Sequence, residues 1–311
     1  MAIDPEILAV RARQARETAP FDVTALPVAE GRRLSDAASI ALNDGLPEVR
    51  SVEDRLIDGP GGSLRLRVMK PDGQRGRGAI LYIHGGGWFA CSIETHDRMM
   101  RTLAADAGVT VVGVDFRLSP EHRYPAALHD CIAAWDWIQA HAGMLGIDAA
   151  RIAVAGDSAG GNLALALMLD RRDRRLATPA CGALFYACLA PGLDTESSRA
   201  FGQGGYGLTD ERMQWYWRNY LGEAGAAPPV LARPLHADPR GLPPLFLGIA
   251  EADTVADDSR LLLDRLHRAG VDATLTVWRG AVHGFLQMTR DVAAARAAVR
   301  DAAGWLAARI S

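Results

Sequence analysis

Short, nearly continuous runs of apolar residues alternate with helical stretches along most of this chain. Such unbroken runs are typical of strands that are buried on both faces of a parallel sheet. They lie at 79–83, 109–114, 152–155, 183–189, 244–249 and 273–277. Helical periodicity predicts helices between them, over about 95–107, 125–141, 159–171, 257–269 and 290–309. The alternation predicts an α/β fold with a mostly parallel central sheet flanked by helices.

Two segments depart from this alternation. The first 50 or so residues are expected to form helices, at 5–18 and 34–42, without a core strand. Residues 191–239 are rich in Gly and Pro and predict one helix, 209–221, with Thr209 as its N-cap. Aromatic residues lie on both sides of that helix, which indicates two apolar neighbours. A cap beside a substrate channel and a helix buried in the core both fit this pattern.

Composition narrows the class of protein. The 311 residues are 49% hydrophobic and 23% charged, which fits one large globular α/β domain and excludes a disordered chain. A net charge of −3 gives no reason to expect nucleic acid or an anionic membrane as partner. The chain has no run of about 18–20 apolar residues, no signal-peptide pattern at its start and no C-x-x-C pair among its four cysteines. We therefore expect a cytoplasmic protein with buried, unpaired thiols.

A G-x-S-x-G motif carries the strongest chemical signal. Gly156, Ser158 and Gly160 stand between a predicted strand and a predicted helix. This context predicts a nucleophile elbow, a sharp turn that lifts the serine hydroxyl clear of the sheet. The backbone N–H of Ala159 would then face developing negative charge at the helix N-terminus. The alternative is an ordinary glycine-rich turn.

A second motif, His-Gly-Gly-Gly-Trp at 84–88, follows an early predicted strand. Consecutive glycines let the backbone approach a ligand closely, and such a loop forms the second half of an oxyanion hole. We expect Gly85 and Gly86 to donate there together with Ala159. The pattern is neither of the two common phosphate-binding loops, and no lysine follows it. His84 is a possible base, but its position favours a structural hydrogen bond that holds the loop.

The order of residues along the chain selects the base and its acid. In folds that carry a nucleophile elbow, the acid and then the histidine follow the serine along the chain. His283 follows the last predicted strand, whereas the other histidines precede Ser158, lie in the insertion or lie within a helix: His84, His96, His122, His129, His141, His236 and His267. Asp253 follows the penultimate strand and is the expected orienting acid, with Glu251 and Asp257 as alternatives.

These motifs together resemble the hormone-sensitive-lipase-like branch of the α/β-hydrolases. The resemblance rests on segments 84–88, 115–121, 156–161 and 283–285, and it spans residues 81–286. Within the branch, segments 97–99, 207–209 and 257–262 are most similar to bacterial acetyl esterases. One departure is visible, because Thr254 and Val255 follow the expected acid where the branch usually has Pro-Leu.

The resemblance implies an α/β-hydrolase fold with a helical cap. Residues 1–50 and 191–239 would form the cap, and residues 51–190 and 240–311 the body. It further implies a serine carboxylesterase that hydrolyses short-chain, acetyl-like esters through Ser158, His283 and Asp253. We expect Trp88, beside the glycine loop, and Trp215, on the cap helix, to contact the substrate.

Two other functions remain open at this point. An amidase or formamidase would use the same triad, and a small-molecule receptor would use the same scaffold without catalysis. A receptor is expected to lack the histidine or the acid, and candidates for both are present. No cluster of side chains has metal-ligand spacing, and the chemistry needs no cofactor. The expected partner is a small acyl ester, and the sequence does not set the oligomeric state.

Overall fold

The computed structural model describes residues 2–17, 19–192, 194–222, 225 and 227–311. In these residues one eight-stranded sheet has the order β1-β2-β4-β3-β5-β6-β7-β8. The strands are β1 (Ser51–Gly59), β2 (Gly62–Lys70), β3 (Ala79–Ile83), β4 (Thr110–Val114), β5 (Ile152–Asp157), β6 (Gly182–Phe185), β7 (Leu245–Ala252) and β8 (Ala273–Val282). The pairs β1–β2 and β2–β4 are antiparallel and the other neighbouring pairs are parallel. The mostly parallel sheet that the sequence predicted is confirmed.

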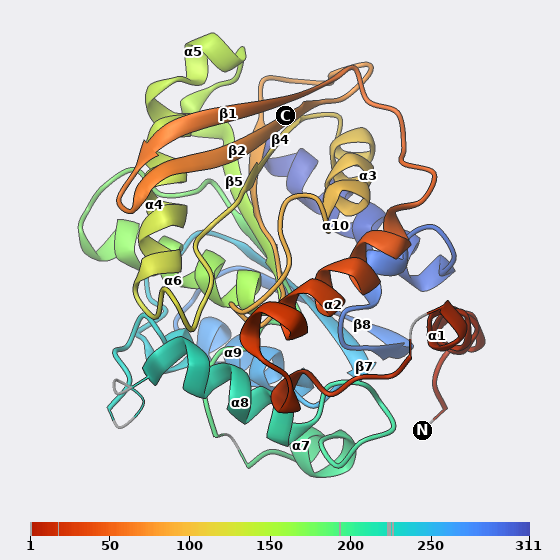
Figure 1. Ribbon diagram of the computed structural model, residues 1–311. Coiled ribbons are helices and arrows are strands. Elements are labelled where there is room, and N and C mark those ends of the chain that lie inside the picture. Colours follow the sequence, from red (N-terminus) through yellow and green to blue (C-terminus); the bar gives the residue numbers. More distant parts are fainter. Residues whose placement is uncertain (1, 18, 193, 223–224, 226) are drawn as a thin grey trace.

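Helices cover both faces of this sheet (Figure 1). One hydrophobic cluster packs α4, α6 and α9 against the sheet, and a second cluster packs α3 and α10 against the opposite face. The bounds are α1 (Pro5–Glu17), α2 (Val28–Ile40), α3 (Asp97–Ala107), α4 (Ala126–Ala140), α5 (Ala142–Leu145), α6 (Ala159–Asp173), α7 (Glu196–Phe201), α8 (Asp210–Leu221), α9 (Ala256–Arg268) and α10 (Ala293–Ile310). Every residue of β3, β4 and β5 is buried, which explains why these strands lack an alternating pattern.

The hairpin formed by β1 and β2 was not predicted from the sequence. Both strands carry many charged residues, because the outward face of this sheet edge is open to water. Asp54 lies opposite Arg67 across the pair, and its carboxylate accepts a hydrogen bond of 2.7 Å from Arg67 Nε. The inward side chains, among them Leu64 and Leu66, alternate with these charges and join the core.

The N-terminal helices and the inserted segment lie together beside the carboxyl ends of the parallel strands (Figure 1). Val23, Phe89 and Ala90 form a small hydrophobic cluster against which Trp215 of α8 packs. Helix α2 begins at Val28, six residues before the predicted start, directly after Pro27 at the N-cap position. Helix α7 was not predicted, and a capping box between Thr195 and Ser198 begins it.

Within the described residues, no helix is both long enough and apolar enough to cross a membrane.

Candidate active site

Ser158 occupies the turn between β5 and α6. Its backbone has φ 54° and ψ −119°, a conformation that an L-residue rarely adopts, so the turn is strained. A Cβ on Gly160 would collide with the Ile83 carbonyl of the neighbouring strand, and a Cβ on Gly156 would lie against Gly160. The glycines of the motif therefore let the turn approach β3 closely. This is the geometry expected of a nucleophile elbow.

The loops after β7 and β8 bring an acid and an imidazole to this turn. These strands are neighbours, with Ala252 paired to Val282, so Asp253 and His283 emerge side by side. The Ser158 hydroxyl donates a hydrogen bond of 2.8 Å to Nε2 of His283. Nδ1 of His283 donates a hydrogen bond of 2.8 Å to Oδ2 of Asp253. Asp253 is 1% exposed, so it holds the imidazole in a site that water scarcely reaches.

The alternative acids are engaged elsewhere. The Glu251 carboxylate accepts a hydrogen bond from the backbone N–H of Gly280. Asp257 accepts one from the backbone N–H of Ser197 and also pairs with Arg260. Of the three carboxylates considered from the sequence, the structure brings only Asp253 to the imidazole.

The oxyanion loop differs in one respect from our expectation. The backbone N–H of Gly85 donates a hydrogen bond of 2.9 Å to Oδ1 of Asp157, so this donor is already used inside the protein. The next two glycines, Gly86 and Gly87, line the cavity above Ser158, and no acceptor for either N–H lies among the described residues. The N–H of Ala159 at the start of α6 is also without an intrahelical partner. Among the described residues, the N–H groups of this loop that lack an acceptor are therefore those of Gly86 and Gly87, whereas we expected Gly85 and Gly86 to be the donors.

The carboxylate of Asp157 holds the glycine loop in place and is itself fixed by other hydrogen bonds. Its buried carboxylate accepts hydrogen bonds from the hydroxyl of Tyr82 at 2.6 Å and from that of Tyr186 at 3.4 Å. Burial alone would raise the pKa of Asp157, but the nearby His96 imidazole and the hydrogen bonds from His96 and Tyr82 outweigh it and lower the pKa. The carboxylate therefore stays charged and keeps its hold on the loop at neutral pH.

His84 has the structural role that its position favoured. Its Nδ1 donates to the Gly85 carbonyl at 2.7 Å, and its ring stacks on Phe116 with centroids 4.2 Å apart. Burial, together with the His96 imidazole, lowers the pKa of His84 to about 4. The ring is therefore neutral at pH 7 and braces the glycine loop.

The four cysteines are buried and unpaired, as the sequence indicated. One of them was not expected near the nucleophile. The Cys188 thiol lies 3.6 Å from the Ser158 hydroxyl, and burial raises its pKa well above the ordinary value. Cys188 therefore remains a neutral thiol beside the serine.

A cavity of about 360 Å³, called here the Ser158 cavity, opens above the serine. Neither Trp88 nor Trp215 lines it. The Trp88 ring is fully buried and stacks on Tyr220 at 4.2 Å, whereas Trp215 packs edge-on against Phe89 at 4.8 Å. Both tryptophans instead join the cap segments to the glycine loop. The aromatic wall of the cavity is Tyr216, whose ring lies against Gly87.

Among the described residues, no three His, Cys, Asp or Glu side chains form a group that could hold a metal ion.

Comparison with known proteins places this geometry in a family. The family model described as the α/β-hydrolase fold matches residues 80–287. An acetyl esterase of Salmonella paratyphi B is 35% identical over 260 residues, which are 82% of this chain and 79% of that protein.

Solved structures agree over nearly the whole length. A hyperthermophilic esterase from the archaeon Pyrobaculum calidifontis superposes with a TM-score of 0.93 at 34% identity, over 99% of each chain. The thermophilic carboxylesterase EstE1, cloned from a metagenomic library, gives a TM-score of 0.88 at 36% identity, over 92% of this chain and 99% of its own. The chain therefore belongs to the α/β-hydrolase fold family, in the hormone-sensitive-lipase-like branch that its motifs indicated, and is a carboxylic ester hydrolase.

Proposed function

We propose that this protein is a serine carboxylesterase that hydrolyses short-chain, acetyl-like acyl esters through Ser158, His283 and Asp253. One observation carries the proposal. The hydroxyl, the imidazole and the carboxylate are joined by two hydrogen bonds of 2.8 Å each, directly below a cavity that holds unpaired N–H donors. The curated relatives that carry the name acetyl esterase support the same substrate class.

The first half of the reaction forms an acyl-enzyme. Oγ of Ser158 attacks the ester carbonyl carbon while Nε2 of His283 takes the hydroxyl proton, and Asp253 stabilises the resulting imidazolium. The carbonyl oxygen becomes an oxyanion that the N–H groups of Gly86, Gly87 and Ala159 receive. Removing one such donor typically costs about 3–4 kcal/mol of transition-state stabilisation. Cleavage of the C–O bond then releases the alcohol, which carries away the proton from His283.

The second half regenerates the serine. Water attacks the acyl carbonyl while His283 takes one of its protons, and the same three N–H groups receive the second oxyanion. The bond to Ser158 Oγ then breaks, the proton returns from His283 to the serine, and the carboxylic acid leaves.

The dimensions of the site support a short acyl chain. The Ser158 cavity is near the lower end of the range for small-molecule sites, about 300–1,000 Å³. Leu208, Met213 and Tyr216 line it on the side of the inserted segment.

Rates on p-nitrophenyl esters of increasing acyl length test the proposal. We expect kcat/KM to be highest for the shortest acyl groups, and p-nitroacetanilide to react far more slowly than p-nitrophenyl acetate. Ser158→Ala should lower kcat by about 10⁴- to 10⁶-fold, while Ser63→Ala, an exposed serine on β2, should retain full activity. More than a few per cent of activity in Ser158→Ala would exclude this nucleophile. A preference for long chains or for the anilide would overturn the substrate class.

We also infer that residues 1–50 and 191–239 form one cap on a body of residues 51–190 and 240–311. Contacts between the two cap segments support this division. Nη2 of Arg11 in α1 donates to the Tyr206 carbonyl at 2.7 Å, and Arg11 and Arg212 line the same cavity.

A further inference from the structure

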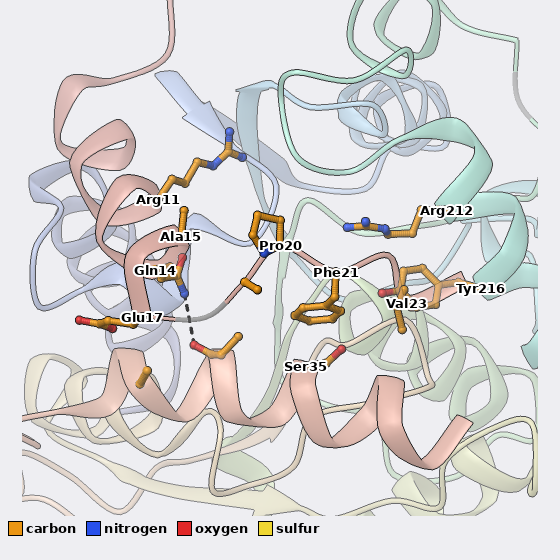
Figure 2. Close-up of a pocket in the computed structure, with 13 residues that line it drawn as sticks. Arg11, Gln14, Ala15, Glu17, Pro20, Phe21, Val23, Ser35, Arg212 and Tyr216 are labelled. Carbon is orange, nitrogen blue, oxygen red and sulfur yellow. Dashed lines mark hydrogen bonds between the residues drawn. The ribbon is translucent and has the colours of Figure 1, made fainter. Parts of the chain in front are cut away.

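A second cavity, called here the outer cavity, adjoins the Ser158 cavity. Its volume is about 430 Å³, and it lies between α1, residues 19–23, α2 and α8 (Figure 2). Gln14, Arg212 and Tyr216 line both cavities, so the two share one wall. The Arg212 side chain therefore borders both the Ser158 cavity and the outer cavity.

Arg212 reaches from α8 into the outer cavity (Figure 2). No carboxylate among the described residues lies within 4 Å of its guanidinium. Its Nε is buried and has no hydrogen-bond partner. The acid on the adjacent loop, Asp22, is exposed, and its carboxylate accepts hydrogen bonds from Thr24 instead. A buried donor without an acceptor is costly, which points to a ligand that supplies one.

The position of Arg212 in its helix does not explain its charge. Arg212 lies in the first turn of α8, where the helix dipole disfavours a cation. The other charged residues of that turn are the acids Asp210 and Glu211, which the dipole favours. The cation at this position therefore contributes little to the stability of the helix, and a role toward a bound anion accounts for it.

Arg11 brings a second guanidinium to the same wall. Its Nη2 donates to the Tyr206 carbonyl and lies against Gly207, where an added Cβ would be 2.5 Å away. Gly207 lines the Ser158 cavity, so the Arg11 guanidinium is positioned between the two cavities. Like Arg212, Arg11 has no carboxylate within 4 Å in the described part of the chain. Among the described residues that line the outer cavity, Glu17 is the one acid, and it is exposed and points away from Arg212 (Figure 2).

We propose that the outer cavity receives a carboxylate carried by the ester substrate, which pairs with Arg212 and Arg11. Guanidinium groups bind carboxylates through strong, directional hydrogen bonds, and a partly buried site strengthens them. The substrates of this chemistry are half-esters of dicarboxylic acids and acyl esters of hydroxy acids. This inference rests on the proposed function, because it assigns the substrate class of the same catalytic site.

Matched pairs of esters test the proposal. The first pair, 4-nitrophenyl hydrogen glutarate and 4-nitrophenyl valerate, differs by a carboxylate in the acyl part. The second pair, 3-acetoxybenzoate and its methyl ester, differs by a carboxylate in the alcohol part. The measured quantity is the ratio of kcat/KM for the charged ester to kcat/KM for its neutral match. In at least one pair we expect Arg212→Gln to lower this ratio by about tenfold, mainly through KM.

Two further variants complete the test. Arg11→Gln should lower the same ratio, whereas Arg218→Gln, an exposed arginine on the same helix, should leave it unchanged. The pair that responds shows which part of the substrate carries the anion. An unchanged ratio in Arg212→Gln for both pairs would overturn the proposal.

A binding measurement separates this proposal from the proposed function. Calorimetry would compare monomethyl glutarate and 3-acetoxybenzoate on Ser158→Ala and on Ser158→Ala/Arg212→Gln. At least one ligand should bind the single variant and lose about tenfold in affinity on the double variant. Equal affinities would exclude the carboxylate site even in an active esterase. If the wild-type protein hydrolysed no ester, the proposed function would fail, and this measurement would still decide whether the anion site exists.

Discussion

The N–H of Gly85 and the carboxylate of Asp157 join the glycine loop to the nucleophile turn through a hydrogen bond of 2.9 Å. Asp157 is the last residue of β5, and Gly85 lies two residues beyond the end of the neighbouring parallel strand β3. Asp157, the residue that precedes Ser158, therefore holds the glycine loop in position beside the serine.

This relationship predicts that Asp157→Ala lowers kcat more than it changes KM. Without the carboxylate, Gly85 loses its acceptor and the N–H groups of Gly86 and Gly87 shift from their positions. A displacement of about 1 Å at a catalytic group can cost roughly 100-fold in rate, so we expect a 10- to 100-fold loss of kcat. Asp157→Asn retains an acceptor oxygen and should be intermediate. Steady-state kinetics on p-nitrophenyl acetate give kcat and KM for each variant, and circular dichroism is the folding control. A folded Asp157→Ala variant with kcat within twofold of wild type would contradict the role.

A second prediction concerns the acid of the triad. Asp253→Asn keeps the size of the side chain but presents an amide to Nδ1 of His283 and so favours the wrong tautomer of the imidazole. In a serine protease the same change lowers kcat by about 10⁴-fold, and we expect a loss of that order here. Glu251→Gln and Asp257→Asn are the matched controls, because these carboxylates bind backbone N–H groups outside the triad. If either control lost as much activity as Asp253→Asn, the choice of acid would be wrong.

The sequence predicted the strands whose environment is uniform. Strands β3 to β7 are parallel to one another and almost fully buried, so each gives a recognisable apolar run. The first half of the edge strand β8 is only partly buried, and its run at 273–277 is correspondingly less apolar. The β1–β2 hairpin was missed because its pattern mixes charged pairs such as Asp54 and Arg67 with buried leucines. The triad candidates could also be predicted from the sequence, because the carboxyl ends of parallel strands meet at one edge of the sheet.

Features set by contacts between distant segments could not be predicted from local patterns. The hydrogen bond from Gly85 to Asp157 depends on the register between β3 and β5, which the sequence does not show, and it engages one of the N–H groups that we expected to be free. Trp88 stands next to the glycines in sequence, but its ring turns into the core and stacks on Tyr220. That Arg212 has no carboxylate partner within the described part of the chain becomes evident only when α1, α2 and α8 are placed together.

A third prediction concerns Thr254, which follows the expected acid at a position where related sequences usually have Pro. Its hydroxyl donates a hydrogen bond of 2.6 Å to the Leu208 carbonyl and so ties the acid loop to the inserted segment. Thr254→Val removes the hydroxyl without changing the shape, which leaves a buried carbonyl without its donor. We expect a loss of about 1–3 kcal/mol in the free energy of unfolding, measured by denaturant titration. Thr254→Ser keeps the hydroxyl and is the control. Equal stability of the Val and Ser variants would show that this hydrogen bond contributes nothing.

The last prediction is a pH dependence of stability that arises at Asp258. Burial raises the pKa of Asp258 from 3.8 to about 7, although its carboxylate accepts hydrogen bonds from the N–H groups of Leu189 and Ala190. The folded state therefore holds a proton that the unfolded chain releases near its ordinary pKa. The stabilisation is complete below about pH 4 and is lost as the pH rises through about 7.

Asp258→Asn, which is neutral at every pH, isolates this effect. The free energy of unfolding of the wild-type protein should fall relative to that of the variant between pH 5 and pH 7. The limiting slope is about 1.4 kcal/mol for each pH unit, and the difference should level off above pH 8. Denaturant titrations across this range measure it, with Asp264→Asn, an exposed acid on the same helix, as the control. If the difference between wild type and Asp258→Asn were constant from pH 5 to pH 8, Asp258 would be ionised in the folded protein throughout that range.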